Sequence, residues 1–98
     1  MAMLNADAFI FNPVGAHDDG ETISSAVTLT PPEGATKLMV QAHVQNVRFT
    51  LDGTAPTASL GFQIAAGDPP IVIPLGNGTT IKVIEEAATA DLQFQWGY

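Results

Sequence analysis

Residues 37–51, KLMVQAHVQNVRFTL, alternate between apolar and polar side chains over almost their whole length. Period-two alternation is typical of strands that bury one face. Asn46 interrupts the alternation and predicts a turn or bulge, so the stretch forms two successive strands. The inward residues are Leu38, Val40, Ala42 and Val44 in the first strand and Val47, Phe49 and Leu51 in the second; Arg48, Thr50 and Asp52 point outward.

Shorter runs of the same kind lie on both sides of this stretch, separated by seven prolines and nine glycines. Asp52-Gly53 and Glu33-Gly34 have the composition of turns. The run 71–73 is apolar on both faces, which is typical of a buried central strand. The last strand places Leu92, Phe94 and Trp96 inward and Gln93 and Gln95 outward. The further expected strands are 8–11, 22–30, 59–65, 80–84 and 91–96, and the expected loops are 14–20, 67–70 and 75–78.

These strands predict an all-β fold for residues 1–98: one small antiparallel β-sandwich or barrel of about seven to eight strands. A chain of 98 residues suits one domain. It contains no cysteine, so it needs no disulfide and has no thiolate ligand for a metal. The first residues lack the basic and apolar regions of a signal peptide, and no apolar run is long enough to span a bilayer.

The charge of the chain excludes two kinds of partner. Ten acidic and three basic residues give a net charge of −7. The three cations, Lys37, Arg48 and Lys82, are scattered, so there is no basic patch for nucleic acid or for an anionic membrane. Charged residues make up 13% of the chain, about half the usual ~25%. A surface with so few charges is suited to being covered by another protein.

The sequence shows no catalytic constellation and implies no cofactor. The serines lack the context of a nucleophile elbow, and His17 and His43 are the only histidines. Cleavage of a glycoside needs two carboxylates on opposite sides of a sugar-binding cleft. The acidic clusters 18–21 and 85–86 are instead groups of neighbours in the sequence, and we interpret them as solvated loop charge. The 17–21 segment, HDDGE, offers oxygen ligands for calcium, but too few for a complete site. We therefore expect a protein that is not an enzyme, with no catalytic, cofactor or metal site.

Several outward residues are polar but uncharged, and these are our candidate interface. Gln41, His43 and Gln45 share the polar face of the strand that begins at Lys37. Trp96 and Tyr98 close the chain, where aromatic side chains either fill a core or anchor an interface. The register of Trp96 with Phe94 favours the core for Trp96. The Thr- and Gln-rich faces also have a simpler interpretation, which is the ordinary strand propensity of threonine.

The segment 46–61, NVRFTLDGTAPTASLG, followed by AAGDPP at 65–70, resembles a pattern in small virion proteins of tailed bacteriophages and prophages. In that pattern a strand and an Asp-Gly turn lead to a Gly-Asp turn, an aliphatic strand and a closing aromatic strand. The resemblance extends over 40–98. Physically, Asp52 can cap its own turn, and Arg48 on the same face is placed to reach the carboxylate of Asp52.

The resemblance implies a bacteriophage structural protein, made in the host cytoplasm and located in the virion. We expect a capsid decoration, or cement, protein that bridges subunits of the shell. Its partners would be the major capsid protein or other virion proteins, and it would be a homo-oligomer. A head–tail connector or tail component is one alternative. A carbohydrate- or receptor-binding sandwich is another, and it would require exposed aromatic residues such as Trp96, Tyr98, Phe9 or Phe11.

Overall fold

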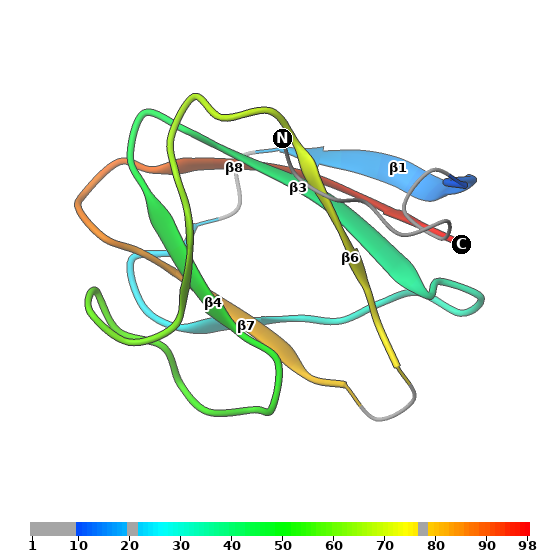
Figure 1. The fold of residues 1–98 in the computed structure, drawn as a ribbon, viewed down its shortest axis with the longest axis horizontal. Coiled ribbons are helices and arrows are strands. Elements are labelled where there is room, and N and C mark those ends of the chain that lie inside the picture. The colour runs from blue at the N-terminus through cyan, green and yellow to red at the C-terminus, as the bar shows by residue number, and fades with distance from the viewer. Residues whose placement is uncertain (1–9, 20–21, 77–78) are drawn as a thin grey trace.

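The computed structural model of the chain describes residues 10–19, 22–76 and 79–98 (Figure 1). In this part of the chain every regular element is a strand, and no helix is long and apolar enough to cross a membrane. The strands are β1 (Pro13–Asp19), β2 (Val27–Leu29), β3 (Lys37–His43), β4 (Val47–Thr50), β5 (Phe62–Ile64), β6 (Ile71–Pro74), β7 (Ile81–Glu85) and β8 (Asp91–Gly97).

The strands form two four-stranded antiparallel sheets, which confirms the predicted β-sandwich. Sheet A has the order β1-β8-β3-β6, and sheet B has the order β2-β7-β4-β5. Every connection along the chain passes from one sheet to the other except the one between β4 and β5. The two layers therefore cannot form independently, and most contacts join residues that are distant in the sequence.

The longest pairing in the molecule joins β3 to β8 in the centre of sheet A. It runs without interruption from Lys37 opposite Gly97 to His43 opposite Asp91. Alternate pairs face inward, and the rings of Phe94 and Trp96 meet edge to face with centroids 6.1 Å apart. The core residues are Ile23, Leu29, Leu38, Val40, Ala42, Val47, Phe49, Ile64, Ile73, Ile81, Val83, Leu92, Phe94 and Trp96. Burying each of the large aliphatic side chains stabilises the fold by about 1.5–3 kcal/mol.

The N-terminal part of the sandwich differs from the prediction. The segment 14–20, expected as a loop, is strand β1 over Pro13–Asp19, which pairs with β8. Its pairing shifts between Val14 and Asp18, and its side chains are nearly all exposed, so the sequence shows no apolar alternation. The strand expected at 8–11 lies partly outside the described residues, and the described Ile10 and Phe11 belong to no strand.

Other elements are shorter or lie elsewhere than expected. The run 71–73 was predicted to be central, but β6 is an edge strand of sheet A, in which Ile73 is buried, Val72 is half-buried and Ile71 is 40% exposed. The strand expected at 22–30 is confined to β2, because residues 24–25 bend after the buried Ile23. The strand expected at 59–65 is confined to β5.

Two residues of the stretch 37–51 also face in other directions than the alternation predicts. Val44 was expected inward, but it has a positive φ of 72° and is exposed, because the chain turns there to pass from sheet A to sheet B. Thr50 was expected outward, but it is buried, because its hydroxyl donates a hydrogen bond to the carbonyl of Thr54 in the following loop. The loop thus folds back over the end of β4.

The connection from β4 to β5 returns through Gly61, which lies directly against the backbone of β4. Its φ is +124°, and a Cβ at this position would lie 2.9 Å from the carbonyl oxygen of Phe49. Only glycine reaches this conformation readily, and only glycine leaves room for the close approach. Gly61 therefore holds β5 next to β4.

We expect Gly61→Ala to lower the free energy of unfolding by about 1–3 kcal/mol, because it adds backbone strain and a clash with Phe49. Urea denaturation of the two proteins measures this change. Gly34→Ala is the matched control, since Gly34 also has a positive φ, of +88°, but open space around its Cβ position. Equal losses for the two variants would show that the close approach at Gly61 contributes nothing.

Candidate functional site

The outer face of sheet A brings together polar side chains from three strands. Gln41 and His43 come from β3, and Gln93 and Asp91 are their cross-strand partners on β8. His17 joins them from β1. The four residues on β3 and β8 project away from the core, because the residues that alternate with them are buried, and His17 meets them through Gln93. We call these five residues the glutamine–histidine face.

A chain of close contacts links the whole glutamine–histidine face. His17 Nε2 lies 2.7 Å from Gln93 Oε1, and Gln93 Nε2 donates to Asp91 Oδ1 at 3.2 Å. Asp91 Oδ2 lies 3.7 Å from Nδ1 of His43, and His43 Nε2 lies 2.9 Å from Gln41 Oε1. The side chains therefore hold one another in place across β1, β8 and β3.

These contacts also fix which ring nitrogens carry hydrogen. Gln41 uses Nε2 to donate to the carbonyl of Asp68 at 2.9 Å, so its oxygen faces His43 as an acceptor. His43 must then donate from Nε2. Gln93 also uses its Nε2 as a donor, so His17 donates to the Gln93 oxygen. Groups held in this way have little side-chain freedom to lose when a partner covers them.

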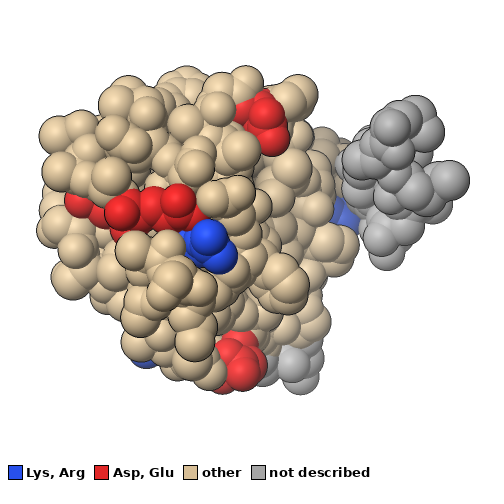
Figure 2. Space-filling view, turned by 60° about the vertical axis from the view of Figure 1, so that its left-hand side comes forward, with Lys and Arg blue, Asp and Glu red and all other residues tan. Residues whose placement is uncertain are grey.

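The glutamine–histidine face carries little charge. Asp91 is the one carboxylate among its five members, which include no lysine or arginine, and the exposed Asp19 of β1 lies opposite Gln93 at its edge. Figure 2 shows a similar pattern on the side of the molecule that it draws, where charged side chains occupy a few places and uncharged groups occupy the rest. Neutral amides cost far less to remove from water than carboxylates or ammonium groups. The face is therefore suited to being covered by another protein surface.

The other predicted interface residues lie elsewhere. Gln45 is in the turn after β3, where its backbone N–H donates to the carbonyl of His43 at 2.8 Å. Trp96 is only 5% exposed and belongs to the core, as its register with Phe94 predicted. Tyr98 follows β8 and is 55% exposed, with its backbone paired to Asn12. Of the predicted set, the structure brings together only Gln41 and His43.

His17 was not predicted as a member of the face. It was expected to lie in a loop, and the exposed, irregular β1 gives no periodic signal from which the strand could have been found. Gln93 was correctly placed on an outer face by the alternation of β8. Its position opposite Gln41 depends on the register between the strands, and no local pattern in the sequence specifies that register.

The acidic segment that begins at His17 does not converge on one point. His17 contacts Gln93 on the outer face, whereas Asp18 lines a shallow opening beside Trp96. The side chains of His17 and Asp18 therefore lie at different surfaces and do not converge on one site. Gly20 and Glu21 lie outside the described residues. Within the described part of the chain, no three His, Asp or Glu side chains are grouped so as to hold a metal ion.

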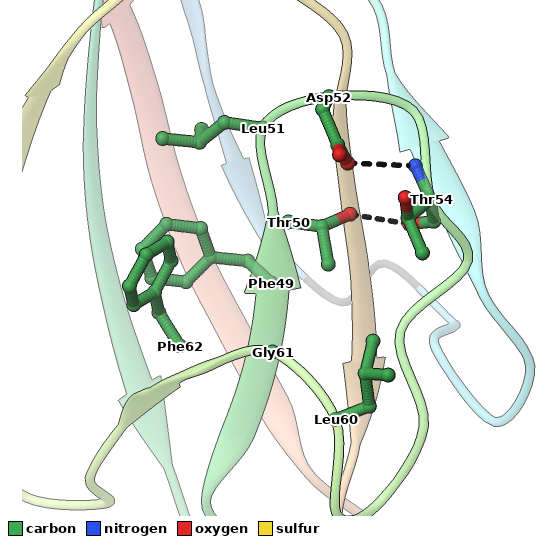
Figure 3. Close-up of a pocket in the computed structure, with 8 residues that line it drawn as sticks. All are labelled: Phe49, Thr50, Leu51, Asp52, Thr54, Leu60, Gly61 and Phe62. Atoms are coloured by element: carbon green, nitrogen blue, oxygen red, sulfur yellow. Dashed lines mark hydrogen bonds between the residues drawn. The ribbon is translucent and has the colours of Figure 1, made fainter.

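A second surface feature is an open groove of about 510 Å³ where β4 ends and β5 begins (Figure 3). The rings of Phe49 and Phe62 project to the same side, with centroids 5.5 Å apart, and Leu60 lies on the other side of the strand, toward the loop. Phe62 is 64% exposed and Leu60 is 46% exposed. The residues that line the groove are Phe49, Thr50, Leu51, Asp52, Thr54, Leu60, Gly61 and Phe62.

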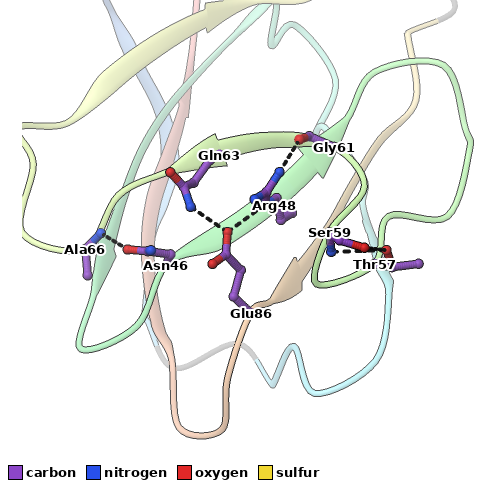
Figure 4. Close-up of polar contacts among 8 residues, drawn as sticks. All are labelled: Asn46, Arg48, Thr57, Ser59, Gly61, Gln63, Ala66 and Glu86. Carbon is purple, nitrogen blue, oxygen red and sulfur yellow. Dashed lines mark hydrogen bonds and ion pairs between the residues drawn. The ribbon is translucent and has the colours of Figure 1, made fainter.

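Arg48 does not reach Asp52, contrary to the prediction (Figure 4). Its Nε donates to Glu86 Oε2 at 2.6 Å, and its Nη1 donates to the carbonyl of Gly61 at 3.0 Å. Gln63 donates to the same carboxylate oxygen at 2.7 Å. Asp52 instead accepts a hydrogen bond from the backbone N–H of Thr54 at 3.0 Å, as the predicted turn cap requires. Arg48 therefore ties β4 to the start of β5 and to the end of β7.

Both carboxyl groups are easier to ionise than free ones. The hydrogen bond from Gln63, and then that from Arg48, lowers the pKa of Glu86. The backbone N–H of Thr54, and then its side chain, lowers the pKa of Asp52. In each case hydrogen bonds favour the charged form. Glu86 and Asp52 thus act here as structural anions.

Comparison of the chain with protein-family models, with curated proteins and with solved structures found no match.

The lowered pKa of Glu86 predicts how stability depends on pH. Its contribution is complete above the pKa of a free glutamate and is lost as the pH falls through the lower pKa of the folded protein. We expect Glu86→Gln to lower the free energy of unfolding at pH 7. The difference between the two proteins should shrink on acidification, as measured by urea denaturation at a series of pH values.

Glu33→Gln is the control for this experiment, because it removes the same charge in the exposed 33–34 turn. It should leave the unfolding free energy at pH 7 nearly unchanged. A difference between wild type and Glu86→Gln that stays constant down to the lowest pH would contradict the ionic role of Glu86.

Proposed function

We propose that this protein is a non-enzymatic structural component of a tailed-bacteriophage particle that decorates and cements the capsid. The observation that carries the proposal is the glutamine–histidine face, a weakly charged surface whose side chains are already held in place by one another. The resemblance of 46–61 and 65–70 to small virion proteins supports the same function. The partner is then the major capsid protein or another virion protein, and the protein is located in the virion after synthesis in the host cytoplasm.

The size of sheet A favours attachment through several contacts. Four strands of up to seven residues present roughly 450 Å² on one side, given strand spacings of about 4.8 Å and a rise of about 3.3 Å per residue. A stable interface covers about 800 Å² on each partner. One sheet face is therefore too small alone, and a homo-oligomer that places several faces on the shell gains affinity from multivalency.

Attachment of this kind would stabilise the shell by mass action. A protein that binds the assembled shell but not the dissociated subunits shifts the equilibrium toward assembly by an amount set by its concentration and affinity. Bridging adjacent subunits adds a link that must break before the shell opens. A head–tail connector or tail component would use the same surface against a different virion protein.

The carbohydrate-binding alternative has less support from the arrangement of aromatic residues. Trp96 fills the core and offers no exposed ring for stacking on a sugar. Tyr98 and Phe62 are exposed, but they belong to different sheets, after β8 and in β5 respectively. Phe11 is half-buried, and Phe9 lies outside the described residues.

We expect purified protein to co-sediment with virus particles assembled without it and to raise the temperature at which those particles release DNA. Gln41→Glu should weaken co-sedimentation by at least tenfold, or about 1.4 kcal/mol, because a carboxylate is costly to desolvate and lies near Asp91. Thr28→Glu is the matched control, since it adds the same charge to the exposed side of sheet B.

Absence of binding by the wild-type protein, together with unchanged heat stability of the particles, would contradict the proposed function. Equal binding by Gln41→Glu and wild type would exclude the glutamine–histidine face as the contact surface.

A further inference from the structure

The groove beside β5 exposes a part of the sandwich that would ordinarily be covered. Phe62 lies opposite Phe49 in the register, and Ile64 lies opposite Val47. Phe49, Val47 and Ile64 are buried in the core, so Phe62 is on the core-facing side of sheet B. Phe62 nevertheless remains 64% exposed. The core is therefore open at this edge, and no other described part of the chain covers it.

The edge strand β5 also lacks the protection that the other edges have. Proteins commonly guard sheet edges with proline, charge or irregular pairing. β1 contains Pro13, two aspartates and a shift of register. β6 ends on Pro74 and follows the two prolines 69–70, and β2 is followed by the two prolines 31–32. β5, like β2, contains neither a proline nor a charged residue, but unlike β2 it has no proline within four residues of either end, so its short length of three residues is its main protection. One side of its backbone is therefore open to pairing with an added strand.

The charge at the groove indicates what the added strand should carry. Asp52 is exposed on the groove lining, and hydrogen bonds from Thr54 hold it ionised. None of the residues that line the groove is a lysine or an arginine. A second copy of this chain would supply little positive charge, because Lys37 is buried and Arg48 is bound to Glu86, which leaves the half-buried Lys82 of β7.

We propose that this groove and the edge of β5 bind an extended segment of a partner protein. The segment runs along β5 and places an aliphatic or aromatic side chain against Phe62 on one side of the strand. On the other side it carries a lysine or arginine that passes Leu60 and reaches Asp52. Strand addition of this kind draws affinity from main-chain hydrogen bonds and specificity from side-chain pockets. The inference goes beyond the proposed function, since it concerns sheet B rather than the glutamine–histidine face of sheet A.

The test is a selection from a yeast-displayed library of random dodecapeptides, with the wild-type protein as bait and Phe62→Glu as the counter-selected bait. We expect the enriched peptides to share an apolar residue within a few positions of a lysine or arginine. Their binding should fall at least tenfold on Phe62→Glu, because a carboxylate replaces the apolar wall of the groove. Asp52→Asn should weaken binding several-fold and abolish the advantage of the basic residue over glutamine at the same peptide position.

Gln41→Glu is the control, and it should bind the selected peptides as well as wild type does. The proposal fails if no peptide is enriched, if the enriched peptides bind Phe62→Glu equally well, or if they lack the basic residue. It also fails if wild type elutes as a dimer that Phe62→Glu dissociates, because a second copy is then the occupant. Gln41 and Phe62 lie on different sheets, so loss of particle binding and loss of peptide binding can be distinguished.

Discussion

The antiparallel pairing of β3 with β8 is the constraint on which the rest of the structure depends. It joins residues 48 to 60 positions apart in a continuous register from Lys37–Gly97 to His43–Asp91. One set of alternate pairs supplies the core of sheet A, and the other set supplies most of the glutamine–histidine face. A slip of β3 by one residue would turn its side chains over, placing Gln41 inside and Leu38 outside. The burial of Leu38, Ala42 and Phe94 therefore also fixes the outer surface.

The two sheets offer surfaces of different character. The outer face of sheet A is polar and already hydrogen-bonded within itself, which suits contact with another folded surface. The edge of sheet B is apolar and open, with an aromatic residue exposed on the side where the core should be closed. If both surfaces are used, the domain would hold a folded partner with one sheet and an extended segment with the other. Such an arrangement suits a protein whose proposed role is to bridge subunits.

The sequence predicted the sandwich, most of its strands and the buried side of β8, because alternation reports directly on which residues face the core. It failed where exposure hides alternation, as in β1, and where one buried face was taken for two, as in β6. The candidate surface could be predicted only in part. Gln41 and His43 follow from alternation within β3, but their meeting with Gln93 and His17 requires a register that no local pattern encodes. The groove was missed because the sequence does not show that the opposite sheet leaves Phe62 uncovered.

The central claim is that the domain acts by covering protein surface in a virus particle with the outer face of sheet A. A cryo-electron microscopy reconstruction of particles that contain the protein tests this claim most directly. The account predicts density for the sandwich on the outside of the shell, with Gln41 and Gln93 facing capsid subunits across a joint. Absence of the protein from the particle, or density in which sheet A faces solvent, would contradict it.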